Sequence, residues 1–290
     1  MPIGHLELDE TLDAFRAACD ELVASTWSGN AEARLALVAA PAMLALDAGG
    51  VPRPKLEIAD VSPGLGAVFD PRKWIVSASG RLYAAAATTA DQKRHRAVLL
   101  YHEARHSEQF FLALRMIAGK QERSVRDRNL VETLDARAWT AAQRSPLRPA
   151  AADARTIQAW IDEYPDARRI EDDLVRARDA LKEVFTELRA TVPDSFESEE
   201  DCRQGELLVK GIAQKVDALR DWFVPALAKY GKLAVEVDAY RVCSQVGGAD
   251  PPKPVKFTEA EEELRTLRGK VRTRTADYRR RAAEQGAAPP

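Results

Sequence analysis

The strongest structural signal in the sequence is Leu99–Leu114, L-L-Y-H-E-A-R-H-S-E-Q-F-F-L-A-L, which holds His102, Glu103 and His106 as an H-E-x-x-H motif. Residues four apart in a helix lie one turn apart, about 40° from one another on the same face. Both imidazoles can therefore reach one tetrahedral zinc ion. Glu103 lies about 100° further round, where it can act as a general base on the attacking water rather than as a ligand. The motif predicts an active-site helix over 92–118.

Apolar residues lie along this predicted helix at positions that would face a core. Asp91 is a reasonable N-cap, so the helix is expected to start near it. One stripe then carries His95, Leu99, His102, His106, Gln109 and Ala113, flanked by Val98, Phe110, Leu114 and Ile117. Because these flanks are typical of a core, we expect a buried helix rather than one that displays two histidines on a solvated surface.

A catalytic zinc ion needs a third protein ligand and an open position for water. No histidine follows His106, so an acidic residue is required, and two glutamates compete. Glu132, in V-E-T-L-D-A-R-A-W, follows the motif after a short interval. Glu236, in Y-G-K-L-A-V-E-V-D-A-Y-R-V, has the small residue Ala239 nearly one turn later, which would let its helix approach the metal helix closely. From the residues alone Glu236 is preferred and Glu132 stays open.

Four further residues are candidates for supporting roles at this site. Gln109, nearly one turn beyond His106, could orient a ligand, and Asp238 could do the same for a histidine ring nitrogen. Arg105 or Tyr240 could stabilise an oxyanion, although Arg105 is equally suited to a structural ion pair.

The remaining periodicities predict a fold that is mainly α with a small β element. A strand is expected at 55–59, and 67–78 resembles two short strands around a D-P-R-K turn. These strands around 55–78 would flank the active-site helix. Either an edge strand there pairs with an extended substrate, or the strands form a small hairpin that only packs on the helix. Helices are expected over 7–28, 31–47 (interrupted or kinked at Pro41), 127–143, 151–163, 167–191 (separated from the preceding helix by Pro165), 203–229, 231–246 and 258–284.

Composition sets the broad class of protein. Charged residues make up 30% of the 290 residues and the net charge is -2, which argues against a dedicated nucleic-acid binder. No apolar run reaches the roughly 20 residues of a membrane span. Three widely spaced cysteines are typical of reduced thiols, so a cytoplasmic protein is expected, with export by an injection machine left open. We expect N-terminal helices in 1–50, a metallopeptidase-like domain in 51–248, and a linker with a charged helix in 249–290.

The segment H-E-A-R-H-S-E-Q resembles the H-E-x-x-H-x-x-Q helix of zincin-type, gluzincin-like zinc metallopeptidase domains in bacterial polymorphic-toxin and contractile-injection-system effectors. Tyr230–Tyr240 is similar to that family's distal Y-x-x-L-x-x-E-x-D-A-x segment, and Gly66–Val76 resembles its strand before the motif helix. The resemblance implies a zincin-like fold that hydrolyses a protein or peptide substrate, with an immunity or secretion-machine partner. It also implies zinc ligation by His102, His106 and Glu236, with Glu103 as the catalytic base.

Two other hypotheses compete with a peptidase. One is a non-catalytic helical binding module in which zinc only stabilises the fold. The other is a helical interaction protein with no metal, whose melting temperature would not respond to a chelator.

Overall fold

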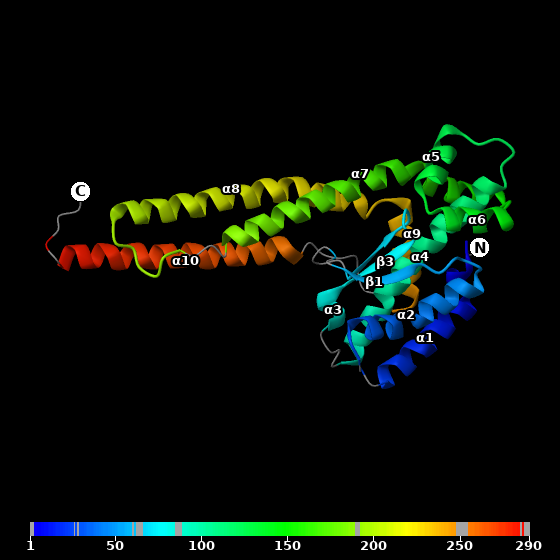
Figure 1. Cartoon of the computed structure of the whole chain (residues 1–290), viewed down its shortest axis with the longest axis horizontal. Helices are drawn as coiled ribbons and strands as arrows, with labels where there is room; N and C mark the ends of the chain where they lie inside the picture. Colours follow the sequence, from blue (N-terminus) through cyan, green and yellow to red (C-terminus); the bar gives the residue numbers. More distant parts are fainter. Residues whose placement is uncertain are drawn as a thin grey trace. The chain divides into compact units, whose positions relative to one another are not determined.

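The helix that carries the H-E-x-x-H motif, α4, runs from Ala90 to Ala118 (Figure 1). The computed structural model describes residues 3–25, 27, 29–59, 61, 66–84, 89–188, 192–247, 255–284 and 286. Helix α4 begins after Thr89, whose side chain accepts a hydrogen bond from the Gln92 amide, so the expected N-cap at Asp91 is wrong. The helix is buried along most of its length, as its apolar flanks predicted.

The chain forms two compact units, and the predicted domain boundaries remain a hypothesis beside them. One unit comprises Met1–Arg169 and Lys229–Lys253, and the other comprises Ile170–Ala228 and Pro254–Pro290. The expected division at 1–50, 51–248 and 249–290 follows composition and linkers instead. The start of the expected linker, residues 249–254, lies outside the described residues.

Helix α4 is the centre of the first unit, where it contacts α1, α2, α6, α9 and strand β2. A short 3-10 helix at His5–Glu7 leads into α1, Asp9–Ala24, and then α2, Ala31–Ala48. Helix α2 continues through Pro41 without an interruption. Its buried residues lie on both sides of the proline, and this packing offsets the missing backbone hydrogen bond.

The small β element is a three-stranded sheet with the order β1-β3-β2. Strands β2, Ala67–Asp70, and β3, Ile75–Ser79, form the expected antiparallel pair around the D-P-R-K turn. Strand β1, Lys55–Ala59, pairs with β3 in parallel. The turn ends at Trp74, whose φ of 55° is unusual for a non-glycine residue. Its indole is buried and donates a hydrogen bond to the Pro52 carbonyl, which stabilises this backbone conformation.

The short helix α3, Gly80–Ala84, follows β3, and two helices fill the interval after α4 where one was expected. Helix α5 is Val125–Thr133 and α6 is Ala136–Arg144, so the single helix predicted over 127–143 is wrong. The break has a local cause: the Asp135 side chain accepts hydrogen bonds from the Arg137 and Ala138 amides and caps α6.

Helix α7, Ala151–Leu188, also differs from the prediction because it continues through Pro165. Ile157, Trp160 and Ile161 are buried before the proline, and Ala167 and Ile170 are buried after it. This buried stripe keeps one helical path where the proline alone favoured two helices. The part of the predicted helix at 189–191 lies outside the described residues.

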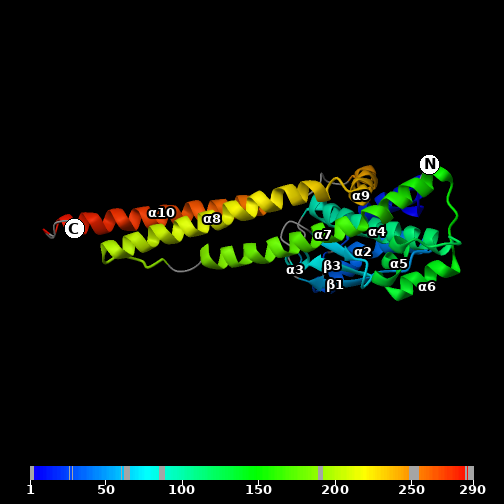
Figure 2. The same cartoon turned by 90° about the horizontal axis from the view of Figure 1, so that it is seen from above.

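The second unit contains three helical segments: α7 from Ile170, α8 (Glu199–Tyr230) up to Ala228, and α10 (Val255–Glu284). Helices α8 and α10 lie side by side in both views (Figures 1 and 2). Buried side chains of the three helices and of the segment that precedes α8 form one core: Leu181, Val184, Leu188, Val192, Phe196, Cys202, Ile212, Val216, Ala260, Leu264, Leu267 and Val271. The basic end of α10 is held by the segment before α8, because Arg274 donates to the Val192 carbonyl and Arg281 to that of Phe196. No described helix is long and apolar enough to cross a bilayer.

Candidate metal centre

Two helices bring three potential metal ligands together in the first unit. His102 and His106 come from α4, and Glu236 comes from the first turn of α9, Ala234–Gln245. The two histidine Nε2 atoms are 3.0 Å apart. Glu236 places Oε1 3.1 Å from the Nε2 of His106 and Oε2 3.4 Å from that of His102. Ala239 on α9 is fully buried, and its small side chain permits the close approach of the two helices.

These separations fit a single small metal ion. In a tetrahedral zinc site with bonds of about 2.0–2.1 Å, the donor atoms lie about 3.3–3.4 Å from one another. The distance of 3.0 Å between the two Nε2 atoms and that of 3.1 Å from Nε2 of His106 to Oε1 of Glu236 are close to that spacing, and one donor atom from each of the three residues lies within 4.8 Å of the others. His102, His106 and Glu236 could therefore hold a metal ion, with two nitrogen donors and one carboxylate oxygen.

Gln109 fixes the orientation of the His106 ring by binding Nδ1, the ring nitrogen on the side away from the metal centre. The amide nitrogen of Gln109 donates to the Val235 carbonyl at 2.9 Å and to Oδ2 of Asp238 at 2.7 Å. Its amide oxygen must then face Nδ1 of His106, 2.9 Å away, so Nδ1 carries the proton in this hydrogen bond. The ring presents Nε2 to the centre, which is the arrangement that metal-binding histidines require.

The charges at the centre favour a cation. Burial lowers the pKa of His106, but the Glu236 carboxylate raises it more, and the net pKa is about 9. Burial would raise the pKa of Glu236, yet the charge of His106 and hydrogen bonds from both histidines hold it well below its usual range. A proton on His106 therefore balances the Glu236 carboxylate when no metal is bound, and a metal ion would replace that proton.

Glu103 lies beside this cluster and is held by the sheet. Its side chain is buried, and Oε2 accepts a hydrogen bond of 2.7 Å from the backbone amide of Phe69 in β2. Burial raises the pKa of Glu103; the histidine charges oppose this rise, and the Glu236 carboxylate adds to it. A carboxyl group with a raised pKa, fixed beside a metal site, is suited to accept and return a proton.

The remaining predicted residues take different places. The ring of Tyr240 lies 4.6 Å from that of His102, centroid to centroid, and burial raises the pKa of its phenol, which therefore remains a donor at neutral pH. Asp238 accepts from Gln109 and Arg105 rather than from a histidine ring, so the contact expected for it is wrong. Arg105 is fully buried and has carboxylate partners, which is the ion-pair role considered for it rather than the oxyanion role.

The rival third ligand, Glu132, lies on α5 and is exposed. The only cluster of potential metal ligands found within the described part of the chain contains Glu236 instead. The sequence did not point to three groups: Glu7 and Glu108, which pair with Arg105, and the Phe69 amide, which donates to Glu103. An acidic residue three positions after Arg105, inside a core-like stretch, was the available signal for Glu108. The Phe69 amide carries no side-chain signal at all.

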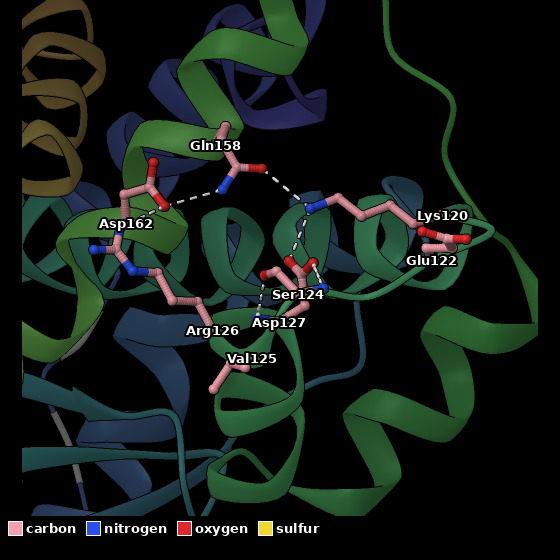
Figure 3. Close-up of a pocket in the computed structure, with 8 residues that line it drawn as sticks. All are labelled: Lys120, Glu122, Ser124, Val125, Arg126, Asp127, Gln158 and Asp162. Carbon is pink, nitrogen blue, oxygen red and sulfur yellow. Dashed lines mark hydrogen bonds and ion pairs between the residues drawn. The ribbon is translucent and has the colours of Figure 1, made fainter.

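A surface hollow of about 670 Å³ lies elsewhere in the first unit, near the end of α4 (Figure 3). Four of its charged groups are paired with one another: Lys120 Nζ lies 2.8 Å from Oδ1 of Asp127, and Arg126 pairs with Asp162 at 3.1 Å. Its lining includes none of the three potential metal ligands, and we do not assign the chemistry to it. Comparisons with protein-family models, with curated proteins and with solved structures found no match for this chain.

Proposed function

We propose that this protein is a zinc-dependent hydrolase of peptide bonds. The observation that carries the proposal is the convergence of His102, His106 and Glu236 within ligand distance of one another, with the buried Glu103 beside them. Two imidazoles and one carboxylate are a ligand set used by catalytic zinc sites, which keep a further position for water or substrate. The resemblance of the motif helix to zinc metallopeptidases supports a peptide bond as the target.

In this reaction the metal ion and the residues of the chain would have separate roles. A bound zinc ion would polarise the scissile carbonyl and lower the pKa of the attacking water. Glu103 would accept the proton of that water and deliver it to the leaving amine. Its hydrogen bond to the Phe69 amide keeps the carboxylate in place. The protonated phenol of Tyr240 would donate to the developing oxyanion.

The burial of the ligands favours a second candidate, a metal site that only stabilises the fold. The side chains of His102, His106 and Glu236 are 12%, 9% and 3% exposed. A closed site of this kind holds helices together and needs no general base. This second candidate gives the buried carboxylate of Glu103 no catalytic role.

The variant Glu103→Gln separates the two candidates, with the exposed Glu132→Gln as a matched control. For a hydrolase, all three proteins bind zinc, and wild type and Glu132→Gln cleave a quenched fluorescent peptide library while Glu103→Gln loses about 100-fold or more of that activity. For a stabilising site, none of the zinc-loaded proteins cleaves peptides. If Glu103→Gln cleaves as fast as wild type, Glu103 is not the base.

The resemblance also suggests a biological setting, which we propose on that ground alone: a bacterial effector that acts on a protein in a target cell and has an immunity or secretion-machine partner. Expression of wild type in a bacterial cytoplasm should then slow growth, whereas Glu103→Gln should not. Equal growth with both proteins would contradict a toxic role in that host.

A further inference from the structure

A group of charged side chains, buried except for the exposed Arg241, lies next to the candidate metal centre. We call Glu7, Arg105, Glu108, Asp238 and Arg241 the Arg105 network. The guanidinium of Arg105 is fully buried; it lies 2.5 Å from Oε2 of Glu108 and 2.7 Å from Oδ2 of Asp238, and it also contacts Glu7. Arg241 bridges Glu7 and Asp238, with 2.7 Å to each. Three buried carboxylates thus depend on two guanidinium groups for their charge balance.

The network is connected to the metal centre through one oxygen atom. Oδ2 of Asp238 accepts hydrogen bonds from Nε of Arg105 at 2.8 Å and from the Gln109 amide at 2.7 Å. The same Gln109 orients His106 through its Nδ1. Arg105 therefore helps to fix the position of Asp238, and through it the Gln109 amide, together with Arg241 on Asp238 and the Val235 carbonyl on Gln109.

The segment Ile3–Glu7 closes the other side of the network. Arg105 donates to the Ile3 carbonyl at 2.9 Å, and Glu108 accepts from the amides at positions 5 and 6. Gly4 has a φ of +118°, and a Cβ atom there would lie 2.7 Å from Cδ of Glu108 and 2.8 Å from Nη1 of Arg105. Only glycine fits against the network at this position.

We propose that Ile3–Glu7 is a positioning element for the metal centre, which acts on His106 through Arg105, Asp238 and Gln109. This inference rests on the proposed metal site. Displacement of the segment removes the Glu7 carboxylate from Arg105 and two backbone amide donors from Glu108. Buried charged groups then lose their partners, so Arg105 and Asp238 shift. Gln109 then loses Asp238, one of the two acceptors that fix its amide, and the orientation of His106 is held less firmly.

The variant Gly4→Ala tests this inference without altering a charged residue or a ligand. Gly50→Ala is the matched control, because Gly50 also has a positive φ, +68°, but a Cβ atom added there would meet no neighbouring atom within 4 Å. Zinc and cobalt(II) affinities are measured by competition with a chelator on folded protein, together with the visible absorption of the cobalt(II) form. We expect Gly4→Ala to weaken binding about 10-fold and to change the cobalt spectrum, and Gly50→Ala to do neither.

A second pair of variants keeps the test valid if Gly4→Ala does not fold. Glu7→Gln removes one network charge, and Glu10→Gln makes the same change at an exposed position nearby. Weaker metal binding and a changed spectrum in Glu7→Gln alone support the inference. Wild-type affinity and spectrum in every folded variant overturn it and leave the metal site intact. Failure of wild type itself to bind either metal overturns the proposed function, and this inference with it.

Discussion

The Gln109 amide oxygen lies 2.9 Å from Nδ1 of His106, while the amide nitrogen of Gln109 is fixed by Val235 and Asp238. A glutamine that could point either way is thus held in one orientation by two acceptors from α9, the helix that also supplies Glu236. Helix α9 therefore contributes to the centre twice, once with a ligand and once by orienting a ligand from α4.

Gln109→Ala is expected to weaken zinc binding about 10-fold to 100-fold, although no ligand is removed. The reason is that His106 loses the acceptor that selects its tautomer. Chelator competition measures the effect, with Gln121→Ala at an exposed position as the control. Equal zinc affinity in both variants would show that Gln109 does not orient the site.

Arg105→Ala is expected to lower the free energy of unfolding of the first unit by about 3–5 kcal/mol. The change leaves the buried Glu7, Glu108 and Asp238 carboxylates short of a counter-charge. Urea unfolding provides the measurement. The comparison variant is Arg94→Ala on the same helix: the Arg94–Asp20 pair is 41% and 71% exposed, and about 0–1 kcal/mol is expected for it. Similar losses in the two variants would contradict the importance of the buried network.

Asp127 is expected to make stability sensitive to acid. Burial raises the pKa of this carboxyl group, but hydrogen bonds from Lys120 and Ser124 lower it more, and the net shift is downward. A group with a lower pKa in the folded state stabilises the fold above its unfolded pKa of about 4, and this contribution is lost as the pH falls through the folded pKa.

The test is the pH dependence of the free energy of unfolding between about pH 5 and pH 2. It should be shallower in Asp127→Asn than in wild type. The variant should also be about 1–2 kcal/mol less stable near pH 7, because the capping box of α5 and the Lys120 ion pair are weakened. Parallel pH profiles for the two proteins would rule out this contribution.

Zinc should stabilise the first unit by mass action. At a free concentration 100 times the dissociation constant, one site adds about 2.7 kcal/mol to the free energy of unfolding. The melting temperature should rise with zinc and fall again with a chelator, and His106→Ala should show neither change. A wild-type melting temperature that changes with neither zinc nor chelator would favour the helical interaction protein with no metal.

The sequence was informative where the structure depends on local geometry. The spacing of His102 and His106 follows from the helical repeat, and the alternation around D-P-R-K indicated the β2–β3 pair. The mainly α fold with a small β element is confirmed. The errors at Pro165 and in 127–143 arose where packing or a cap overrode the local pattern.

Non-local relationships could be narrowed from the sequence but not settled. Glu236 lies 130 residues after His106 in the chain, and it was favoured over Glu132 only by its local context, with Ala239 nearby, and by the resemblance of Tyr230–Tyr240 to a metallopeptidase segment. The Phe69 amide that holds Glu103 is a backbone group, which no residue type marks. The link from Asp238 to Gln109 depends on how α9 packs against α4, and the sequence of each helix alone does not specify that packing.

The central claim is that His102, His106 and Glu236 bind one metal ion, and zinc content measured by elemental analysis tests it most directly. The proteins are wild type, Glu236→Ala and Glu132→Ala, purified without a histidine tag and incubated with zinc before removal of the excess. We predict about one zinc ion per chain in wild type and in Glu132→Ala, and almost none in Glu236→Ala. Retention of zinc by Glu236→Ala, or its absence from wild type, would contradict the account.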